Sequence, residues 1–328
     1  MSELIKENEG AGNAGFIDKL KSSLQGIGML GLILIALFIV LALSSDKFFT
    51  VNNLSNLARQ TSIVGIIAVG MTFVIISAGI DLSVGSVLAF GGVVAAMMMR
   101  SGLPIPLAFV AAILIGIICG LVNGFIIFDM KVTPMIATLG TMTMIRALVM
   151  LITHANYISP LPKSFVRFAA ASAFGIPTLT MIWIAIVIGA YIVTKHMRLG
   201  RNIYAIGSNL ESARLSGISI RKNTYFVYII CAVLSSIAGV LTAGRLATGI
   251  PTAGSGYEMQ VIAAVVVGGG SLSGGEGTII GTLIGALLIA TISNGGNLLG
   301  INPQILKIIN GFLIVISVYI DQRNRSKR

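Results

Sequence analysis

Long apolar stretches constrain the fold of this chain more than any other feature of its sequence. An α-helix needs about 20 apolar residues to cross the roughly 30 Å hydrocarbon core of a bilayer. The sequence therefore predicts an all-α integral membrane protein, a polytopic helical bundle of about ten transmembrane segments with broken or re-entrant helices. The third and the eighth stretches have the weakest pattern of a full crossing, and the eighth, residues 259–268, is too short to cross alone. The stretches are residues 26–45, 63–79, 82–99, 103–128, 134–153, 176–194, 223–244, 259–268, 278–296 and 305–320.

The composition supports this fold class. Hydrophobic residues make up 55% of the chain and charged residues only 10%, whereas a soluble domain carries about 25% charged residues. The net charge is +11, but ten of the 22 Lys and Arg residues lie in residues 195–222 and 323–328, at the edges of apolar stretches. This distribution follows the positive-inside rule. It indicates contact with membrane lipid and argues against a nucleic acid partner.

The loops predict the orientation and the division of the chain. The loop 195–222 carries six Lys or Arg residues and one Glu, so it is expected in the cytoplasm. Six predicted segments precede this loop and four follow it, which makes both termini cytoplasmic. We expect a cytoplasmic N-terminal segment at 1–25, a transmembrane domain at 26–320 and a basic cytoplasmic tail at 321–328. The first apolar run is longer than the core of a signal peptide, so we interpret it as an uncleaved span.

Two irregular segments interrupt the apolar pattern, at residues 79–85 and 268–277. Irregular backbone at membrane depth requires protein or a water-filled cavity around it. Asp81 lies in the first segment, and a charge at mid-bilayer costs at least about 2.5–3.5 kcal/mol. It either lines a functional site or caps the following helix through the amide of Ser83 or Val84. Arg146 lies in the middle of the fifth stretch, and we hypothesise that it pairs with Asp81.

Neutral polar and small residues also lie within apolar stretches. Asn123, Gln260 and Asn294 either hydrogen-bond across helices or line a path for a polar, uncharged solute such as a sugar. Small residues at a spacing of four allow close helix packing. Two such ladders are Gly116, Gly120 and Gly124, and Gly281 with Gly285.

The sequence lacks the motifs of an enzyme or of a nucleotide site. Residues 272–276 read LSGGE, similar to the signature of ABC ATPases, but the chain has no GxxxxGK[ST] phosphate loop. It has no HExxH or GxSxG string, and its eleven acidic residues leave little material for acid–base catalysis. We therefore expect no catalytic residues, no metal site and no cofactor.

One segment of the cytoplasmic loop indicates a partner. Residues 209–215 have the pattern of a short amphipathic helix, capped by Ser208 or Asn209 and ended at Gly217. A short helix on a cytoplasmic loop has no lipid to contact, so we expect it to dock on a soluble protein.

This segment carries a family resemblance. Glu211-Ser212-Ala213, followed by Gly217, resembles the "EAA" loop of ABC importer permeases. From about residue 48 to residue 321 the chain resembles the ribose-type monosaccharide permeases. The matching strings include FTVNNL at 49–54, GIDLSVGS at 79–86, RLSGI at 214–218 and GTLIGA at 281–286. Ser-Gly-Gly at 273–275 replaces the Ala-Gly-Gly of that family and produces the false ATPase signature.

The resemblance implies a permease in a bacterial inner membrane, a homodimer with one pathway for a monosaccharide such as ribose or allose. It implies a cytoplasmic ABC ATPase subunit and a periplasmic sugar-binding protein. Alternatives are an ABC permease for a non-sugar solute and an ion-coupled secondary transporter that uses Asp81. The expected ATPase-coupling residues are Glu211, Ser212, Ala213, Arg214 and Gly217. The candidate pathway residues are Asp81, Ser83, Asn123, Arg146, Glu258, Gln260 and Asn294.

Overall fold

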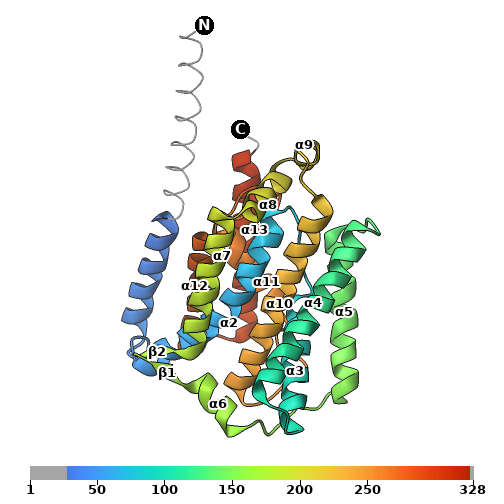
Figure 1. Cartoon of the computed structure of the whole chain (residues 1–328). Helices are drawn as coiled ribbons and strands as arrows, with labels where there is room; N and C mark the ends of the chain where they lie inside the picture. The colour runs from blue at the N-terminus through green and yellow to red at the C-terminus, as the bar shows by residue number, and fades with distance from the viewer. Residues whose placement is uncertain (1–27, 326–328) are drawn as a thin grey trace.

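Apolar helices occupy all ten predicted stretches. The computed structural model describes residues 28–325 of the chain (Figure 1). Residues 1–25, predicted as a cytoplasmic segment, lie outside the described residues. The ten apolar helices are Gly28–Ser44, α2 (Val51–Ile76), α3 (Val84–Arg100), α4 (Ile105–Phe128), α5 (Pro134–Thr153), α7 (Thr178–His196), α10 (Ile220–Leu246), α11 (Tyr257–Val267), α12 (Ile279–Leu298) and α13 (Pro303–Arg325).

The lengths of these helices agree with a membrane protein. Six of them, α2, α4, α5, α7, α10 and α12, are long and apolar enough to cross a bilayer, and the described residues hold four shorter apolar helices. The only sheet in the described part is a hairpin of β1 (Ser172–Ala173) and β2 (Ile176–Pro177). The predicted all-α, polytopic fold is confirmed.

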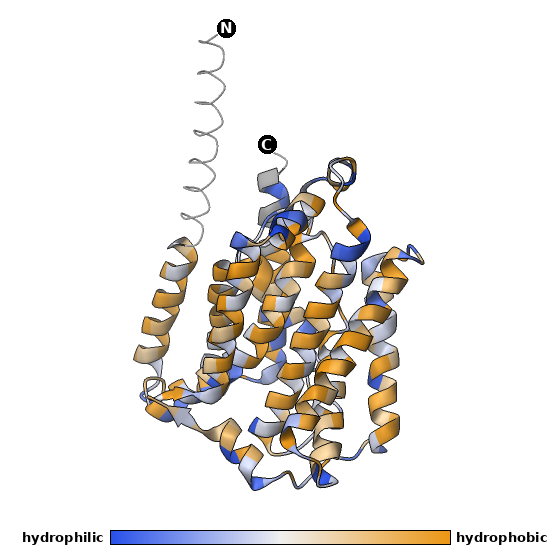
Figure 2. Cartoon of the chain, in the orientation of Figure 1, coloured by the Kyte–Doolittle hydropathy of each residue, from blue (hydrophilic) through white to orange (hydrophobic). Residues whose placement is uncertain are grey.

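The bundle has a buried centre and a lipid-facing rim. In the apolar window of α2, 89% of the residues are buried, and in α10 the share is 72%. In α5 and α7 the share is only 22%, and their outward faces remain apolar (Figure 2). A soluble protein would cover such faces with polar residues. The exposed apolar surface is therefore the surface for lipid or for another membrane subunit.

Both predicted glycine ladders lie at tight helix contacts. A Cβ atom at Gly116 would lie 2.5 Å from the Cα of Val233, and one at Gly120 would lie 2.4 Å from the Cα of Ile229. These contacts join α4 to α10. In the second ladder, a Cβ at Gly285 would lie 2.0 Å from the carbonyl oxygen of Ala264. Only glycine allows these backbones to approach so closely.

Short helices mark the two ends of the bundle. At one end lie α8 (Arg198–Ser208) and α9 (Leu210–Leu215), and we call it the α9 end. The Gly28 end of the first helix and the last turns of α13 also lie there (Figure 1). The opposite end, which we call the α6 end, carries the β-hairpin and the amphipathic helix α6 (Lys163–Ala170). The sequence analysis predicted neither α6 nor α8.

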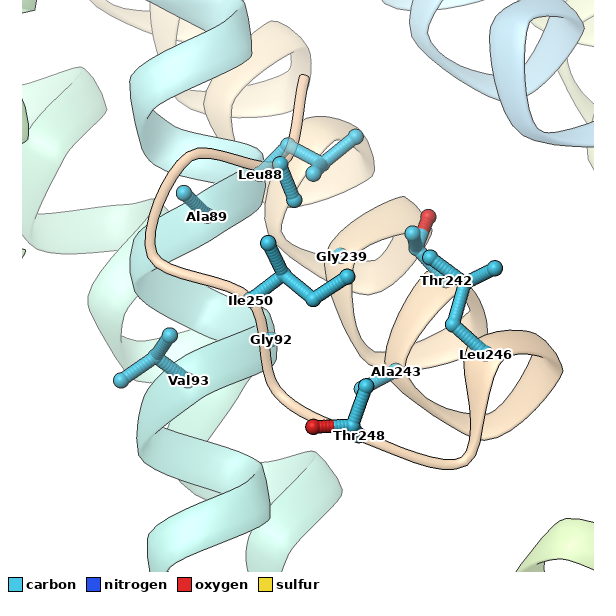
Figure 3. Close-up of a pocket in the computed structure, with 11 residues that line it drawn as sticks. Leu88, Ala89, Gly92, Val93, Gly239, Thr242, Ala243, Leu246, Thr248 and Ile250 are labelled. Carbon is cyan, nitrogen blue, oxygen red and sulfur yellow. The ribbon is translucent and has the colours of Figure 1, made fainter. Parts of the chain in front are cut away.

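Two half-length helices meet inside the bundle. After α10 the chain turns back and runs along α3 before α11 begins (Figure 3). A small pocket between α3, α10 and this returning segment is lined by Leu88, Gly239 and Ile250. A Cβ at Gly85 would lie 2.3 Å from the carbonyl oxygen of Gly254. The N-termini of α3 and α11 therefore abut, which explains why the third and eighth stretches are short.

Gly120→Leu should destabilise the bundle. The added side chain would collide with the backbone of α10, and overpacking of this kind costs about 1–3 kcal/mol. We expect a lower thermal unfolding midpoint for the purified protein in detergent. Gly140→Leu is the matched control, because a Cβ at Gly140 meets nothing within 4 Å. Equal midpoints for the two variants would contradict the packing of α4 against α10.

Candidate functional site

Helix α9 is the most exposed ordered element of the α9 end. The side-chain oxygen Oδ1 of Asn209 accepts a hydrogen bond from the amide of Ser212 at 2.9 Å and caps the helix. Gly217 follows the helix with φ of +78°, and the amide of Ile218 donates to the carbonyl of Ala213 at 3.1 Å. Gly217 thus ends the helix in the left-handed conformation that is common at helix C-termini. The predicted helix, its cap at Asn209 and its end at Gly217 are confirmed.

The surface of α9 mixes charge with exposed leucines. Glu211 and Arg214 form an ion pair of 3.1 Å, and their side chains are 64% and 70% exposed. Leu210 is 55% exposed and Leu215 78%, whereas Ala213 is buried against the rest of the loop. Such an exposed pair is worth little in stability, and exposed leucines at a loop tip contribute nothing to the core. Exposed apolar and charged side chains thus lie together on α9.

Helix α8 links α9 to the interior of the bundle. A Cβ at Gly207 would lie 1.8 Å from the carbonyl oxygen of Ile76, the last residue of α2. The same carbonyl accepts from the amide of Gly275 at 2.8 Å. The hydroxyl of Tyr204 donates to the carbonyl of Gly277 at 2.6 Å, and burial raises the pKa of Tyr204, so the phenol stays protonated as a donor. The glycine-rich loop 268–277 thus lies at the α9 end, held by α8.

Three of the predicted pathway residues form a buried polar chain. Oδ1 of Asp81 accepts from the amide of Ser83 at 2.9 Å and from its hydroxyl at 2.6 Å. The amide nitrogen of Asn123 donates to the hydroxyl of Ser83 at 3.0 Å, and its oxygen accepts from Thr141 at 2.7 Å. This chain joins the break before α3 to α4 and α5. Asp81 therefore makes the predicted contact with the Ser83 amide, but the N-cap of α3 is Ser83 and no side chain caps that helix.

The hypothesised pair of Asp81 with Arg146 is wrong. Nη1 of Arg146 donates to the carbonyl oxygens of Pro251 at 2.7 Å and Ala253 at 2.9 Å. These carbonyls belong to the segment that turns back after α10, whose backbone groups have no helical partners. They satisfy the guanidinium in place of an acid, and the contact fastens α5 to the returning segment. Oδ1 of Asp81 is instead bonded to Ser83, while its buried Oδ2 has no hydrogen-bond partner.

The remaining predicted pathway residues lie in different places. Glu258, half-buried in the first turn of α11, accepts from the amide of Gly256 at 3.2 Å. Gln260 lies in the same turn and is half-buried. Asn294 on α12 exchanges two hydrogen bonds, of 2.8 and 3.1 Å, with Asn53 on α2. Asn294 thus joins two helices, and the seven residues do not form one site.

The comparisons with known proteins agree with this arrangement. Residues 53–318 match the family described as the permease component of the branched-chain amino acid transport system. This chain is a member of that permease family. The family consists of membrane-embedded transport subunits, which are not enzymes.

Curated relatives match almost the full length of the chain. The ribose import permease RbsC of Escherichia coli is 42% identical over 302 residues, which cover 89% of this chain and 93% of the relative. RbsC of Bacillus subtilis is 40% identical, with coverage of 88% and 91%. The D-allose transport system permease of Escherichia coli is 38% identical, with coverage of 86% of each chain. No solved structure is significantly similar to the chain.

The substitutions Asp81→Asn and Arg146→Gln should act independently on stability. Asparagine keeps an oxygen for the Ser83 amide, and Arg146 donates to the carbonyls of Pro251 and Ala253 and not to Asp81. Residues without shared partners change stability additively to within about 0.3–0.5 kcal/mol. Thermal unfolding of the two single variants and the double variant tests this. A coupling energy above about 1 kcal/mol between the two substitutions would contradict this result and support a charge pair of Asp81 with Arg146.

Proposed function

We propose that this chain is the transmembrane permease subunit of an ATP-driven importer for a monosaccharide such as ribose or allose. The observation that carries the proposal is similarity over almost the full length to relatives named as ribose import permeases, at 40–42% identity. Further relatives are named for allose, at 38% identity, and for xylose, at 33%. All three named substrates are neutral monosaccharides.

A non-sugar solute is the second candidate. It is favoured by the description of the family, which refers to branched-chain amino acids. The relatives named for ribose, allose and xylose cover 86–90% of this chain, and we prefer the monosaccharide for that reason.

The partners follow from the two ends of the bundle. We infer that the α9 end faces the cytoplasm, because its loop 195–222 carries six basic residues and one acid. A cytoplasmic ABC ATPase would bind α9, and Glu211, Ser212, Ala213, Arg214 and Gly217 would carry this contact. A periplasmic sugar-binding protein would approach the α6 end. A second copy of the chain would complete the pathway.

The contacts of α8 supply a route for coupling. Movement of α9 by the ATPase would shift α8, which contacts Ile76 at the end of α2 and the loop 268–277 through Gly207 and Tyr204. Those contacts lead to the two breaks that precede α3 and follow α11. Selection of the sugar would rest largely on the binding protein, so the permease needs only a small difference in affinity between its two states.

Charge reversal or bulk at α9 should uncouple transport. Glu211→Lys breaks the ion pair with Arg214, and Gly217→Asp forces a side chain into the left-handed region at φ of +78°. We expect ATP-dependent uptake of ribose, allose or xylose to fall at least about tenfold in proteoliposomes that contain the chain, its ATPase and its binding protein.

Gly140→Ala on α5, where the added Cβ meets nothing within 4 Å, is the control away from α9 and should keep uptake near the wild-type value. Uptake by the chain alone, driven by an ion gradient and unaffected by the α9 variants, would replace this proposal with a secondary transporter. ATP-dependent uptake of a branched-chain amino acid in place of any sugar would keep the importer and change its substrate class.

A further inference from the structure

The segment between α10 and α11 exposes polar groups far from both ends of the bundle. Thr252, Ser255 and Gly256 are exposed in this segment, although it lies beside the N-terminus of α3. The segment has irregular backbone and includes two glycines with positive φ, Gly254 at +71° and Gly256 at +85°. The depth of this segment in the membrane therefore determines whether lipid can surround it, or only protein and water.

Helix lengths give that position. Helix α3 runs from this point to the α6 end with 17 residues, and α11 runs to the α9 end with 11 residues (Figure 1). At 1.5 Å per residue the two helices span about 25 Å and about 16 Å. Their sum is close to the thickness of a bilayer with its headgroups, about 40–45 Å. The exposed segment thus lies near the middle of the membrane.

Lipid is an unsuitable neighbour for this surface. Irregular backbone and charged side chains at mid-bilayer face protein or water, since hydrocarbon cannot satisfy them. Arg146 and Glu258 both border the segment. Arg146 holds its carbonyls at 2.7 and 2.9 Å, and Glu258 accepts from the amide of Gly256. Glu258 lies close enough to Arg146 to interact with it electrostatically, yet the two form no direct ion pair.

The combination of groups fits a polyol. A carboxylate accepts hydrogen bonds from neighbouring hydroxyls, a guanidinium donates to them, and the hydroxyls of Thr252 and Ser255 can do both. Hydrogen bonds to charged groups are about twice as strong as those between neutral groups. A neutral sugar bound here leaves no charge in the membrane, because the protein already carries one positive and one negative group. A free cation or anion would upset that balance.

We propose that Arg146, Thr252, Ser255 and Glu258 form a transient binding station for a neutral monosaccharide at the midpoint of the pathway. The inference rests on the proposed function and deepens it by assigning residues to the sugar. Asp81, Ser83 and Asn123 are fully buried and bonded to one another, so they support the helices around the station and do not contact the solute.

The variant Glu258→Gln distinguishes a role of Glu258 in sugar binding from a role as a cap of α11. Glutamine keeps an oxygen for the Gly256 amide, so a capping role alone predicts unchanged transport. The station predicts a fall of about tenfold in sugar uptake, the effect of one lost charge-assisted hydrogen bond. ATP hydrolysis stimulated by the binding protein should stay within about twofold of wild type, because α9 is untouched. Asp129→Asn, which keeps an oxygen for the Tyr225 hydroxyl, is the control for loss of an acid outside the station.

Thiol labelling tests whether water reaches the station. The two native cysteines, Cys119 and Cys231, are buried, so the wild-type protein should react little with the reagent. Ser255→Cys should react in membranes with a charged methanethiosulfonate reagent, and millimolar ribose should slow the reaction. Ile188→Cys on α7, whose native side chain is 55% exposed on the apolar rim, should not react.

Each result decides between the alternatives. Unchanged uptake in Glu258→Gln overturns the station, as does an equal loss of uptake and ATP hydrolysis, which indicates a structural role. A Ser255→Cys thiol that is unreactive, or reactive without protection by ribose, also overturns it. Failure of the wild-type complex to take up any of ribose, allose or xylose would instead overturn the proposed function. Loss of dimers in Glu258→Gln would assign the surface to contact between two copies.

Discussion

Every backbone amide and carbonyl within the hydrocarbon core needs a hydrogen-bond partner in protein or water. The two breaks in this bundle, before α3 and before α11, depend on side chains that supply such partners. At the first break, the carbonyl of Ile80 receives the hydroxyls of Tyr228 and Thr138, each at 3.4 Å. At the second, Arg146 donates to two carbonyls. A single long side chain thereby holds the returning segment at the point where the half-length helix α11 begins.

The same constraint connects the membrane interior to the docking surface. The last carbonyl of α2 accepts from Gly275, in a loop that α8 holds through Tyr204 and Gly207. Because these partners are backbone groups in close contact, α8 cannot move without displacing the end of α2 or the loop beside it. Interiors packed this tightly transmit displacement. A docking helix of six residues can for this reason influence helices that lie far from its partner.

The sequence predicted those features whose causes are local. Apolar length located the ten helices, and side-chain type located the Asn209 cap and the Gly217 end. Helix α8 was missed because its apolar residues, Ile203 and Ile206, face the bundle within an otherwise polar loop. The predicted pair of Asp81 with Arg146 was wrong, because Arg146 contacts backbone carbonyls and not the acid that its charge suggested. The carbonyls that Arg146 contacts are 105 and 107 residues away along the chain, and no composition signal marks them.

The charged residues of the interior differ in how exposed they are to water. That difference bears on the source of energy for transport. An acid that couples transport to an ion must exchange with water on both sides of the membrane. Asp81 is fully buried and bonded to Ser83, in contact with no exposed surface. Glu258 and Arg146 border an exposed segment, and each holds backbone groups of that segment. Neither arrangement favours ion coupling. The exposed α9, connected through α8 to the end of α2, fits the entry point that we propose for energy from a cytoplasmic ATPase.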